Sequence, residues 1–360
     1  MLEENSLTQD IIRISTSKQN HNNILERVQD TLTRLKFKHC NIKDTDNKKL
    51  LYATLGQGHP HVLFMSSFPD AIIKKHYQFT LTPNTNNFNA KCTALACFLH
   101  ACEKFTNEQK FKGRISIFIQ NEPNFNYSAN LKSIFKKISL TPQTVDFCII
   151  GEPNNNKKIN QEINIGSLGD ILFTITSYGS PYLSKTHHTN AVQNLLTLLH
   201  KLTNTFLDNG NESFSSSSLN FISIDAHQTS PDQLPEQAKA KILVHYNNNH
   251  TPQEIINWMK NNIIFTNGQF ELNSELISHP FISDISEGTK ALKQSIHPVI
   301  SKNVHFGTNC TSELSDFIKD YCPFAEFGLF TGQQKDLHEN ITNLQEIYYQ
   351  FLSRYFSSKK

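Results

Sequence analysis

The stretch Val145-Asp146-Phe147-Cys148-Ile149-Ile150-Gly151-Glu152-Pro153-Asn154 decides the fold class of this chain. An apolar run that ends in glycine and proline is typical of a buried strand in a parallel sheet, because proline cannot continue the ladder of hydrogen bonds. Open α/β sheets bind their ligands beyond the carboxyl ends of such strands. Glu152 stands at that end and is therefore a candidate site residue. The alternative is a turn glutamate that faces solvent.

The residues before this strand alternate between the two kinds of regular structure. Apolar spacing predicts helices over 7–14, 23–35, 90–105 and 131–138, and strands over 50–55, 61–65 and 113–119. The glycine-containing turn 56–60 between the first two strands indicates an antiparallel pair. The alternation as a whole favours an α/β fold of the doubly wound kind.

The order of elements changes after Gly166. The pattern predicts strands over 171–176, 219–224 and 238–246, helices over 190–202 and 252–262, and a last helix over 340–356. The middle part lacks the parallel repeat and indicates an inserted α+β domain. We therefore expect a core domain formed by residues 1–166 and 281–360, interrupted by an inserted domain over 167–280.

Composition narrows the class of protein. The 34 basic and 32 acidic residues nearly cancel and form no basic block, so nucleic acid is not an expected partner. No stretch approaches the ~18 apolar residues of a membrane span, and the first residues lack the features of a signal peptide. Seven cysteines without CxxC pairs favour a reducing compartment, and Cys92, Cys97 and Cys102 are expected to be buried on one helix. We expect a cytoplasmic protein with no membrane partner.

Three landmarks keep a common order and spacing along nearly the whole chain. They are Gly113-Arg114 before a strand, Gly151-Glu152-Pro153 after one, and Phe327-Gly328 followed by Leu337-His338-Glu339. With these landmarks the chain resembles the co-catalytic zinc exopeptidases. The resemblance implies a zinc-exopeptidase-like mixed sheet core flanked by helices, and an inserted α+β domain that acts as lid and forms the homodimer. Such enzymes hydrolyse amides with two zinc ions, which share a bridging aspartate and a water, and with a glutamate as base.

Carried over position by position, the resemblance places most of the family's metal ligands on residues of other types. The first histidine-x-aspartate motif falls on Ser67-Phe68-Pro69, and the bridging aspartate falls on Asn89. The last histidine falls on Lys335. The paired glutamates fall on Pro123 and Asn124, with Glu122 one position early. Glu152 is the one ligand position that keeps its acid, so the resemblance implies a vestigial pocket with no metal site and no cofactor.

The positions that contact substrate in the family are altered as well. The arginine expected to bind a substrate carboxylate falls on His245. The glycine-rich substrate loop falls on residues 309–315, where Thr311 and Ser312 keep the family's residue types. His245, Thr311 and Ser312 are therefore the predicted substrate-binding residues.

These replacements predict a degenerate hydrolase homologue that lacks two-zinc amide hydrolysis and persists as a structural or partner-binding protein. It would form a homodimer through the inserted domain, or a heterodimer with an active homologue. The alternative is an active metal-dependent amidohydrolase with zinc as its cofactor. A further hypothesis pairs Lys335 with Glu152, so that an ammonium replaces the charge of the metal; the alternative is two unrelated exposed side chains.

Overall fold

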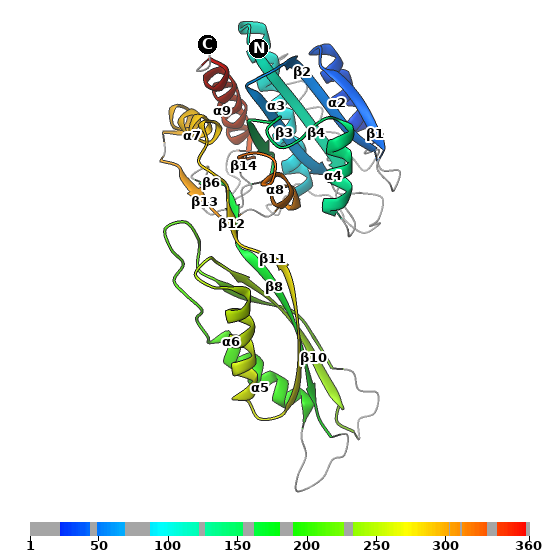
Figure 1. Cartoon of the computed structure of the whole chain (residues 1–360), viewed down its shortest axis with the longest axis vertical. Helices are drawn as coiled ribbons and strands as arrows, with labels where there is room; N and C mark the ends of the chain where they lie inside the picture. The colour runs from blue at the N-terminus through cyan, green and yellow to red at the C-terminus, as the bar shows by residue number, and fades with distance from the viewer. Residues whose placement is uncertain are drawn as a thin grey trace. The chain divides into compact units, whose positions relative to one another are not determined.

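The computed structural model divides into two compact units, Met1–Ile165 with Ser283–Lys360, and Gly166–Ile282. It describes residues 22–43, 49–68, 87–121, 127–153, 162–180, 190–226, 233–301, 303–309, 312–329 and 337–357 (Figure 1). No helix within these ranges is long and apolar enough to cross a membrane.

A mixed sheet of eight strands forms the centre of the larger unit, in the order β1-β2-β4-β3-β5-β14-β6-β13. The strands are β1 (Lys38–Lys43), β2 (Lys49–Gln57), β3 (His61–Phe68), β4 (Gly113–Asn121), β5 (Phe147–Ile150), β6 (Glu162–Asn164), β13 (His305–Gly307) and β14 (Phe324–Glu326). The neighbours β4, β3, β5 and β14 run parallel, so their carboxyl ends share one edge of the sheet. The predicted α/β class with a mixed sheet core is confirmed.

The predicted antiparallel pairing of strands 50–55 and 61–65, which are β2 and β3, is wrong. β4 lies between β2 and β3, antiparallel to the first and parallel to the second. Two glycines make room for it: a Cβ on Gly56 would lie 2.2 Å from the Gly113 carbonyl oxygen, and one on Gly113 would lie 2.4 Å from the Pro60 carbonyl oxygen. Both glycines also have positive φ angles, +78° and +124°. The turn therefore crosses the start of β4 instead of closing a hairpin.

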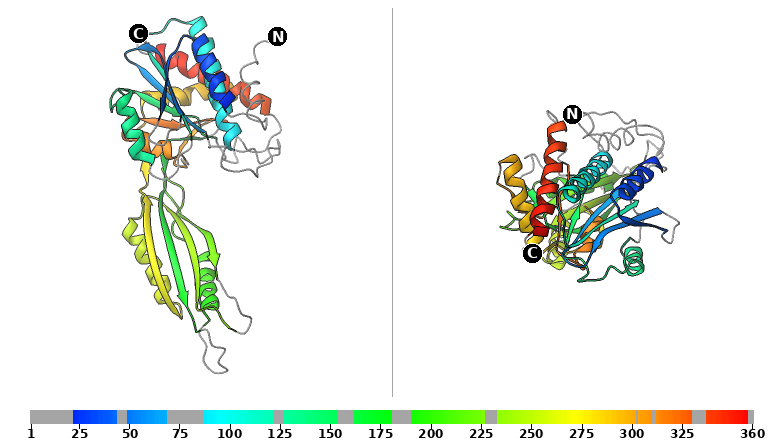
Figure 2. Two further views of the ribbon diagram at one scale, coloured as in Figure 1. Left: turned by 90° about the vertical axis from the view of Figure 1, so that its right-hand side faces the viewer. Right: turned by 90° about the horizontal axis from the view of Figure 1, so that it is seen from above.

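Helices cover both faces of this sheet. They are α2 (Asn22–Arg34), α3 (Asn87–Glu108), α4 (Tyr127–Lys137), α7 (Glu287–Ile300), α8 (Glu313–Ile318) and α9 (Leu337–Ser357). The right panel of Figure 2 shows α3 and α9 side by side, and Phe64 of β3 stacks on Phe98 of α3 with ring centroids 4.4 Å apart. On the opposite face Phe118 of β4 contacts Phe135 of α4, which contacts Phe317 of α8. Aromatic packing thus anchors the central strands from both sides.

The cysteines of α3 confirm the expectation of buried thiols. Cys92, Cys97 and Cys102 are fully buried and free. Burial raises the pKa of each thiol well above its ordinary value, because the thiolate would lose its hydration. These residues act as small apolar side chains between α3 and its neighbours.

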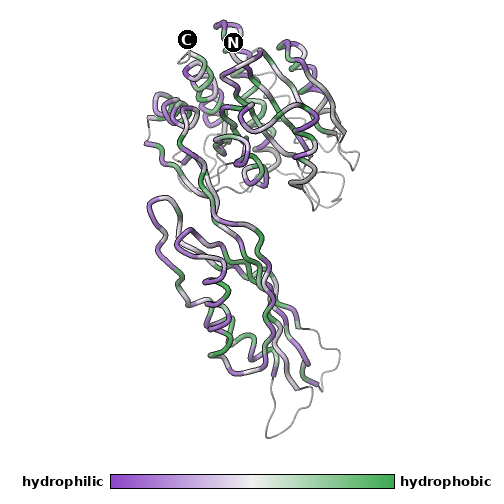
Figure 3. The backbone as a smooth tube through the Cα atoms, viewed as in Figure 1, coloured by the Kyte–Doolittle hydropathy of each residue, from purple (hydrophilic) through white to green (hydrophobic). Residues whose placement is uncertain are grey.

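The smaller unit is an antiparallel sheet of four strands in the order β11-β8-β10-β9. Its elements are β7 (Gly166–Ser167), β8 (Gly169–Tyr178), α5 (Ala191–Thr203), β9 (Ser218–Asp225), β10 (Gln237–Tyr246), α6 (Pro252–Ile264), β11 (Gln269–Ser278) and β12 (Phe281–Ile282). Both helices pack on one face of the sheet, where alternate residues of β8 and β10 are buried. Figure 3 shows the same alternation as changes in hydropathy along these strands. Strand β11, whose Phe270 and Leu272 alternate with polar residues, is absent from the elements predicted from the sequence.

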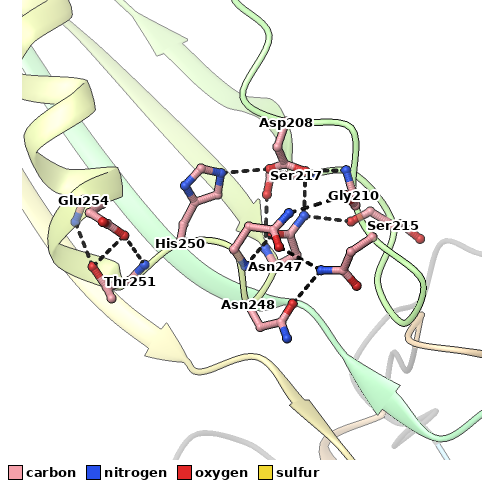
Figure 4. A network of polar contacts seen from close by, with 11 residues as sticks. Asp208, Gly210, Ser215, Ser217, Asn247, Asn248, His250, Thr251 and Glu254 are labelled. Atoms are coloured by element: carbon pink, nitrogen blue, oxygen red, sulfur yellow. Dashed lines mark hydrogen bonds and ion pairs between the residues drawn. The ribbon is translucent and has the colours of Figure 1, made fainter.

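A polar network fixes the loop before β9 to the turn between β10 and α6 (Figure 4). The Asp208 carboxylate accepts hydrogen bonds from the Gly210 and Ser217 backbone N–H groups and from the Asn247 amide, at 2.6, 3.2 and 2.6 Å. His250 Nε2 lies 3.0 Å from the second Asp208 oxygen. Burial by itself raises the pKa of Asp208, but these hydrogen bonds outweigh it and lower the pKa to about 2. The network thus joins the loop before β9 to the turn after β10 through side-chain contacts and not through strand pairing.

Candidate functional site

The Gly151-Glu152 turn is fixed by backbone contacts to two neighbouring strands. Gly151 N–H donates to the Met65 carbonyl of β3 at 2.9 Å, and Phe327 N–H donates to the Ile150 carbonyl at 2.9 Å. Gly328 makes the closest approach, because a Cβ there would lie 2.3 Å from the Glu152 carbonyl oxygen. These contacts fix the backbone of Glu152 at the carboxyl ends of the parallel strands.

The Glu152 carboxylate pairs with a lysine of α3. Lys91 Nζ lies 3.1 Å from Glu152 Oε1, and it donates a hydrogen bond of 3.1 Å to Ser67 Oγ at the end of β3. The side chains of Lys91 and Glu152 are only 10% and 5% exposed. The alternative of a turn glutamate that faces solvent is therefore wrong. Charge pairing offsets the cost of removing both ions from water.

Two further polar groups are buried at the same strand ends. Gln120 of β4 is the register partner of Ser67 of β3, and neighbours in register point to the same face of a sheet. Gln120 is 2% exposed, and its Nε2 has no hydrogen-bond partner within the part of the chain that the structure describes. Ser66 is buried as well, but it follows the alternation and points to the opposite face. Ser67, Gln120, Lys91 and Glu152 thus form one buried polar cluster, which we call the strand-end cluster.

The structure brings together two of the predicted pocket residues, Ser67 and Glu152, through Lys91. Asn89 lies in the first turn of α3, two positions before Lys91. The remaining predicted pocket positions, Pro69, Glu122, Pro123, Asn124 and Lys335, lie outside the described residues. The pairing of Lys335 with Glu152 therefore stays a prediction, and the ammonium that the structure places beside Glu152 belongs to Lys91.

The predicted substrate-binding residues are held by other contacts. Ser312 caps the N-terminus of α8 and donates its backbone N–H to Glu326 Oε1 at 3.0 Å. His245 is in β10 of the smaller unit, where its Nδ1 lies 2.5 Å from Asp170 Oδ1. Thr311 lies outside the described residues. Their role in substrate binding stays a prediction.

Sequence reasoning missed Lys91 and Gln120 as members of the site. Lys91 stands two residues after Asn89, the position of the family's bridging aspartate, and Gln120 reads as an ordinary polar residue near the end of a strand. A usable signal existed for Gln120, because a polar side chain follows the apolar run of β4 at the ligand-binding edge of the sheet. Nothing in the spacing of Lys91 indicates that it reaches the end of β5.

The described part of the site does not fit a two-zinc centre. Such a centre needs several histidine and carboxylate ligands around each ion. Among the described residues no three His, Cys, Asp or Glu side chains gather where an ion could be held. The strand-end cluster offers one carboxylate, and an ammonium already pairs with it. A cation entering there would meet electrostatic repulsion from Lys91.

The chain is similar to several known hydrolases. No protein-family model matches it. It is 26% identical to a succinyl-diaminopimelate desuccinylase of Ehrlichia chaffeensis over 98% of this chain and 97% of the relative. It is also 26% identical to the enzyme of that name from Orientia tsutsugamushi, over 98% and 96%. The crystal structure of an M20 family metallo-carboxypeptidase from Sulfolobus solfataricus shares the fold, with a TM-score of 0.65, 15% identity and 99% of each chain covered.

The expectation that the protein has no cofactor is wrong. The Sulfolobus protein is a metallo-carboxypeptidase, and this chain has the same fold over its full length. Metal dependence is thus a property of the group to which the chain is related, and altered ligand positions do not establish that a cofactor is absent. The chain is thus similar over nearly its whole length to the succinyl-diaminopimelate desuccinylases, and it shares its fold with an M20 family metallo-carboxypeptidase.

Proposed function

We propose that this chain is a degenerate homologue of succinyl-diaminopimelate desuccinylase, which no longer hydrolyses amides by the two-zinc route and is retained as a structural or partner-binding protein. The observation that carries the proposal is the buried ion pair between Lys91 and Glu152. An ammonium stands beside the one carboxylate that keeps its place among the family's ligands. The loss of a positioned ligand or of the base should lower the rate of hydrolysis by ~100-fold or more, and here several are lost.

The proposal assigns residues 167–280 to a dimerisation domain of the α+β type. The partner is a second copy of this chain or an active homologue. The open face of the four-stranded sheet supports such a role, because α5 and α6 cover only the other face. Ile222 and Ile224 of the edge strand β9 are more than half exposed, as expected of a surface that a partner covers. We place the protein in the cytoplasm.

A second candidate function is an active metal-dependent desuccinylase. It would hydrolyse N-succinyl-diaminopimelate to succinate and diaminopimelate, a reaction on the route to lysine and to peptidoglycan precursors. The match to desuccinylases over 98% of the chain favours it. In this case Glu152 would be a ligand of the metal, and the ion pair between Lys91 and Glu152 would have to open when the metal binds.

One experiment separates the two candidates. The purified full chain is incubated with zinc or cobalt, its metal content is measured, and hydrolysis of N-succinyl-diaminopimelate is followed beside an active relative. We expect turnover at least ~100-fold below that of the relative. The second candidate would be established if the chain bound stoichiometric metal and turned over at the relative's level, and if Glu152→Gln abolished that turnover. Light scattering on the same sample tests for the dimer.

A further inference from the structure

We propose that Asn267 is a modification site, at which the side-chain amide is lost spontaneously through attack by the backbone nitrogen of Gly268. The chain contains two Asn-Gly pairs, Asn209-Gly210 and Asn267-Gly268, and both lie in the smaller unit. Asparagine before glycine is the sequence most open to this reaction, because glycine places no side chain beside the attacking nitrogen. The two pairs have different surroundings, and only those of Asn267 allow the reaction. The inference concerns the chemistry of the polypeptide and is independent of the proposed function.

No helix or strand fixes the peptide groups of the Asn267-Gly268 pair. The pair lies between α6, which ends at Ile264, and β11, which begins at Gln269. Both residues are exposed, and the Gly268 N–H donates no hydrogen bond within the described ranges. The preceding Thr266 is the last residue tied to the helix, because its N–H donates to the Ile263 carbonyl at 2.9 Å. The attacking nitrogen of Gly268 is thus accessible to water and to the Asn267 side chain.

The fold itself requires glycine at this reactive position. Gly268 has a φ angle of +129°, which residues with a side chain rarely adopt. It also packs against α5, where a Cβ on Gly268 would lie 2.7 Å from Asn194 Nδ2. A larger residue would have to displace the backbone or the Asn194 side chain. The connection between α6 and β11 therefore keeps the residue type that makes Asn267 reactive.

The polar network around Asp208 protects the other pair. The Asn209 side chain is exposed as well, so exposure alone does not separate the two sites. The Gly210 N–H donates to Asp208 Oδ1 at 2.6 Å, and the Gly210 carbonyl accepts a hydrogen bond from Asn249 at 3.4 Å. A Cβ on Gly210 would lie 2.6 Å from the Phe214 carbonyl oxygen. Attack requires the backbone to rotate until the asparagine Cγ meets the next nitrogen, so the network must open first.

The reaction needs water and no other reagent. The Gly268 nitrogen bonds to Cγ of Asn267, and the bond between Cγ and the amide nitrogen breaks. The amide nitrogen leaves as ammonia with the proton of the Gly268 N–H, and a cyclic imide remains. Water then opens the imide. Cleavage between Cγ and the Gly268 nitrogen gives aspartate, whereas cleavage between the main-chain carbonyl carbon and that nitrogen gives isoaspartate.

Both products alter the start of β11. Each adds a negative charge two residues after Phe265, the C-cap of α6, where the unpaired carbonyl groups of the helix already carry partial negative charge. Isoaspartate also routes the main chain through the side-chain carbon. The longer main chain lies directly before Gln269, which pairs with Tyr178 of β8. We therefore expect the modification to loosen the first residues of this edge strand.

The experiment compares the two Asn-Gly pairs in the folded and the unfolded chain. The purified full chain is incubated at mildly alkaline pH in water labelled with heavy oxygen, once in native buffer and once in urea. Label enters where the imide opens, and mass spectrometry of digests prepared in ordinary water gives the rate at each asparagine. In the folded chain we expect label at Asn267 and a rate at least ~10-fold lower at Asn209, because the Asp208 network must open first. In urea the two rates should become similar.

Two outcomes of this comparison would overturn the proposal. The first is absence of label at Asn267 in the folded chain while the same position reacts in urea. The second is a folded chain in which Asn209 reacts as fast as Asn267 or faster. Asn267→Gln should remove the label from this position, because attack on the longer side chain would require a larger and less favoured ring.

A further variant tests the reason for the difference. Asp208→Ala removes the acceptor of the Gly210 N–H, so we expect the reaction at Asn209 to accelerate by ~10-fold or more while Asn267 keeps its rate. Glu212→Gln, at an exposed position of the same loop, is the matched control and should change neither rate. Unfolding of Asp208→Ala would bring both sites to their rates in urea, so the rate at Asn267 distinguishes the two effects. An unchanged rate at Asn209 in this variant would contradict protection by the network.

Discussion

Lys91 Nζ lies 3.1 Å from Glu152 Oε1, and the two side chains are at most 10% exposed. One residue comes from α3 and the other from the turn after β5, so the ion pair joins a helix to the carboxyl edge of the central sheet. Removal of one partner from such a pair leaves a charge buried without compensation.

The first prediction concerns this coupling. Lys91→Met and Glu152→Gln should each destabilise the larger unit, the first by about 3–5 kcal/mol because it leaves the carboxylate buried. The double variant should lose clearly less than the sum of the single losses. Urea unfolding of the four proteins, followed on the larger unit, gives the coupling free energy. Additive losses would show that the two charges do not depend on each other.

The second prediction concerns His61, which is buried at the start of β3. Its Nε2 lies 2.7 Å from Ser116 Oγ, and its Nδ1 lies 2.5 Å from the Thr144 carbonyl oxygen. Burial lowers the pKa of His61 to about 4, which the hydrogen bond to Thr144 only partly opposes. In the unfolded chain His61 binds a proton near pH 6.5. The free energy of unfolding is therefore highest above that pH and falls as the pH drops towards 4.

The loss should reach about 3 kcal/mol at pH 4, from ~1.4 kcal/mol for each unit of difference in pKa. Stability measured by urea unfolding between pH 7 and 4 should fall less steeply in His61→Gln. His200→Gln, which changes an exposed histidine of α5, is the matched control and should keep the wild-type slope. Equal slopes in His61→Gln and the wild type would refute the assignment.

The third prediction concerns Asp208 in the smaller unit. Its pKa of about 2 in the folded chain lies below the ordinary value of 3.8, so its contribution to stability is full above pH 3.8 and is lost as the pH falls through 2. Asp208→Asn should destabilise the smaller unit by about 2 kcal/mol at pH 7, because a charged acceptor of several hydrogen bonds becomes neutral. Thermal unfolding measures the loss. Glu212→Gln, at an exposed position of the same loop, should leave the melting temperature unchanged.

The fourth prediction concerns the buried thiols. Cys92, Cys97, Cys102, Cys148 and Cys322 are buried and free, and burial raises the pKa of each. Iodoacetamide reacts with the thiolate, so the native chain should be alkylated at these positions at least about ten-fold more slowly than the urea-unfolded chain. Mass spectrometry of digests gives the rate for each cysteine. Rapid alkylation of Cys97 in the native chain would show that α3 is not packed as described.

Much of the local structure could be read from the sequence, because burial imposes a visible period on each element. The apolar run before Gly151, the helix that contains the three cysteines, and the strands β8, β9 and β10 all follow from that period. Strand pairing does not follow from it. The position of β4 between β2 and β3 depends on the close approach of Gly56 and Gly113, and local hydropathy contains no information about that contact.

For the site, the sequence by itself determined that Glu152 ends a central strand and that the other ligand positions of the family hold different residues. The tertiary structure alone decided which cation meets that carboxylate. Sequence reasoning selected Lys335 because it aligns with a lost ligand, whereas folding brings the Nζ of Lys91 to Glu152 and to Ser67. The physical reason is that a long flexible side chain near the start of α3 can reach several strand ends, and only the packing of α3 on β3 selects one of them.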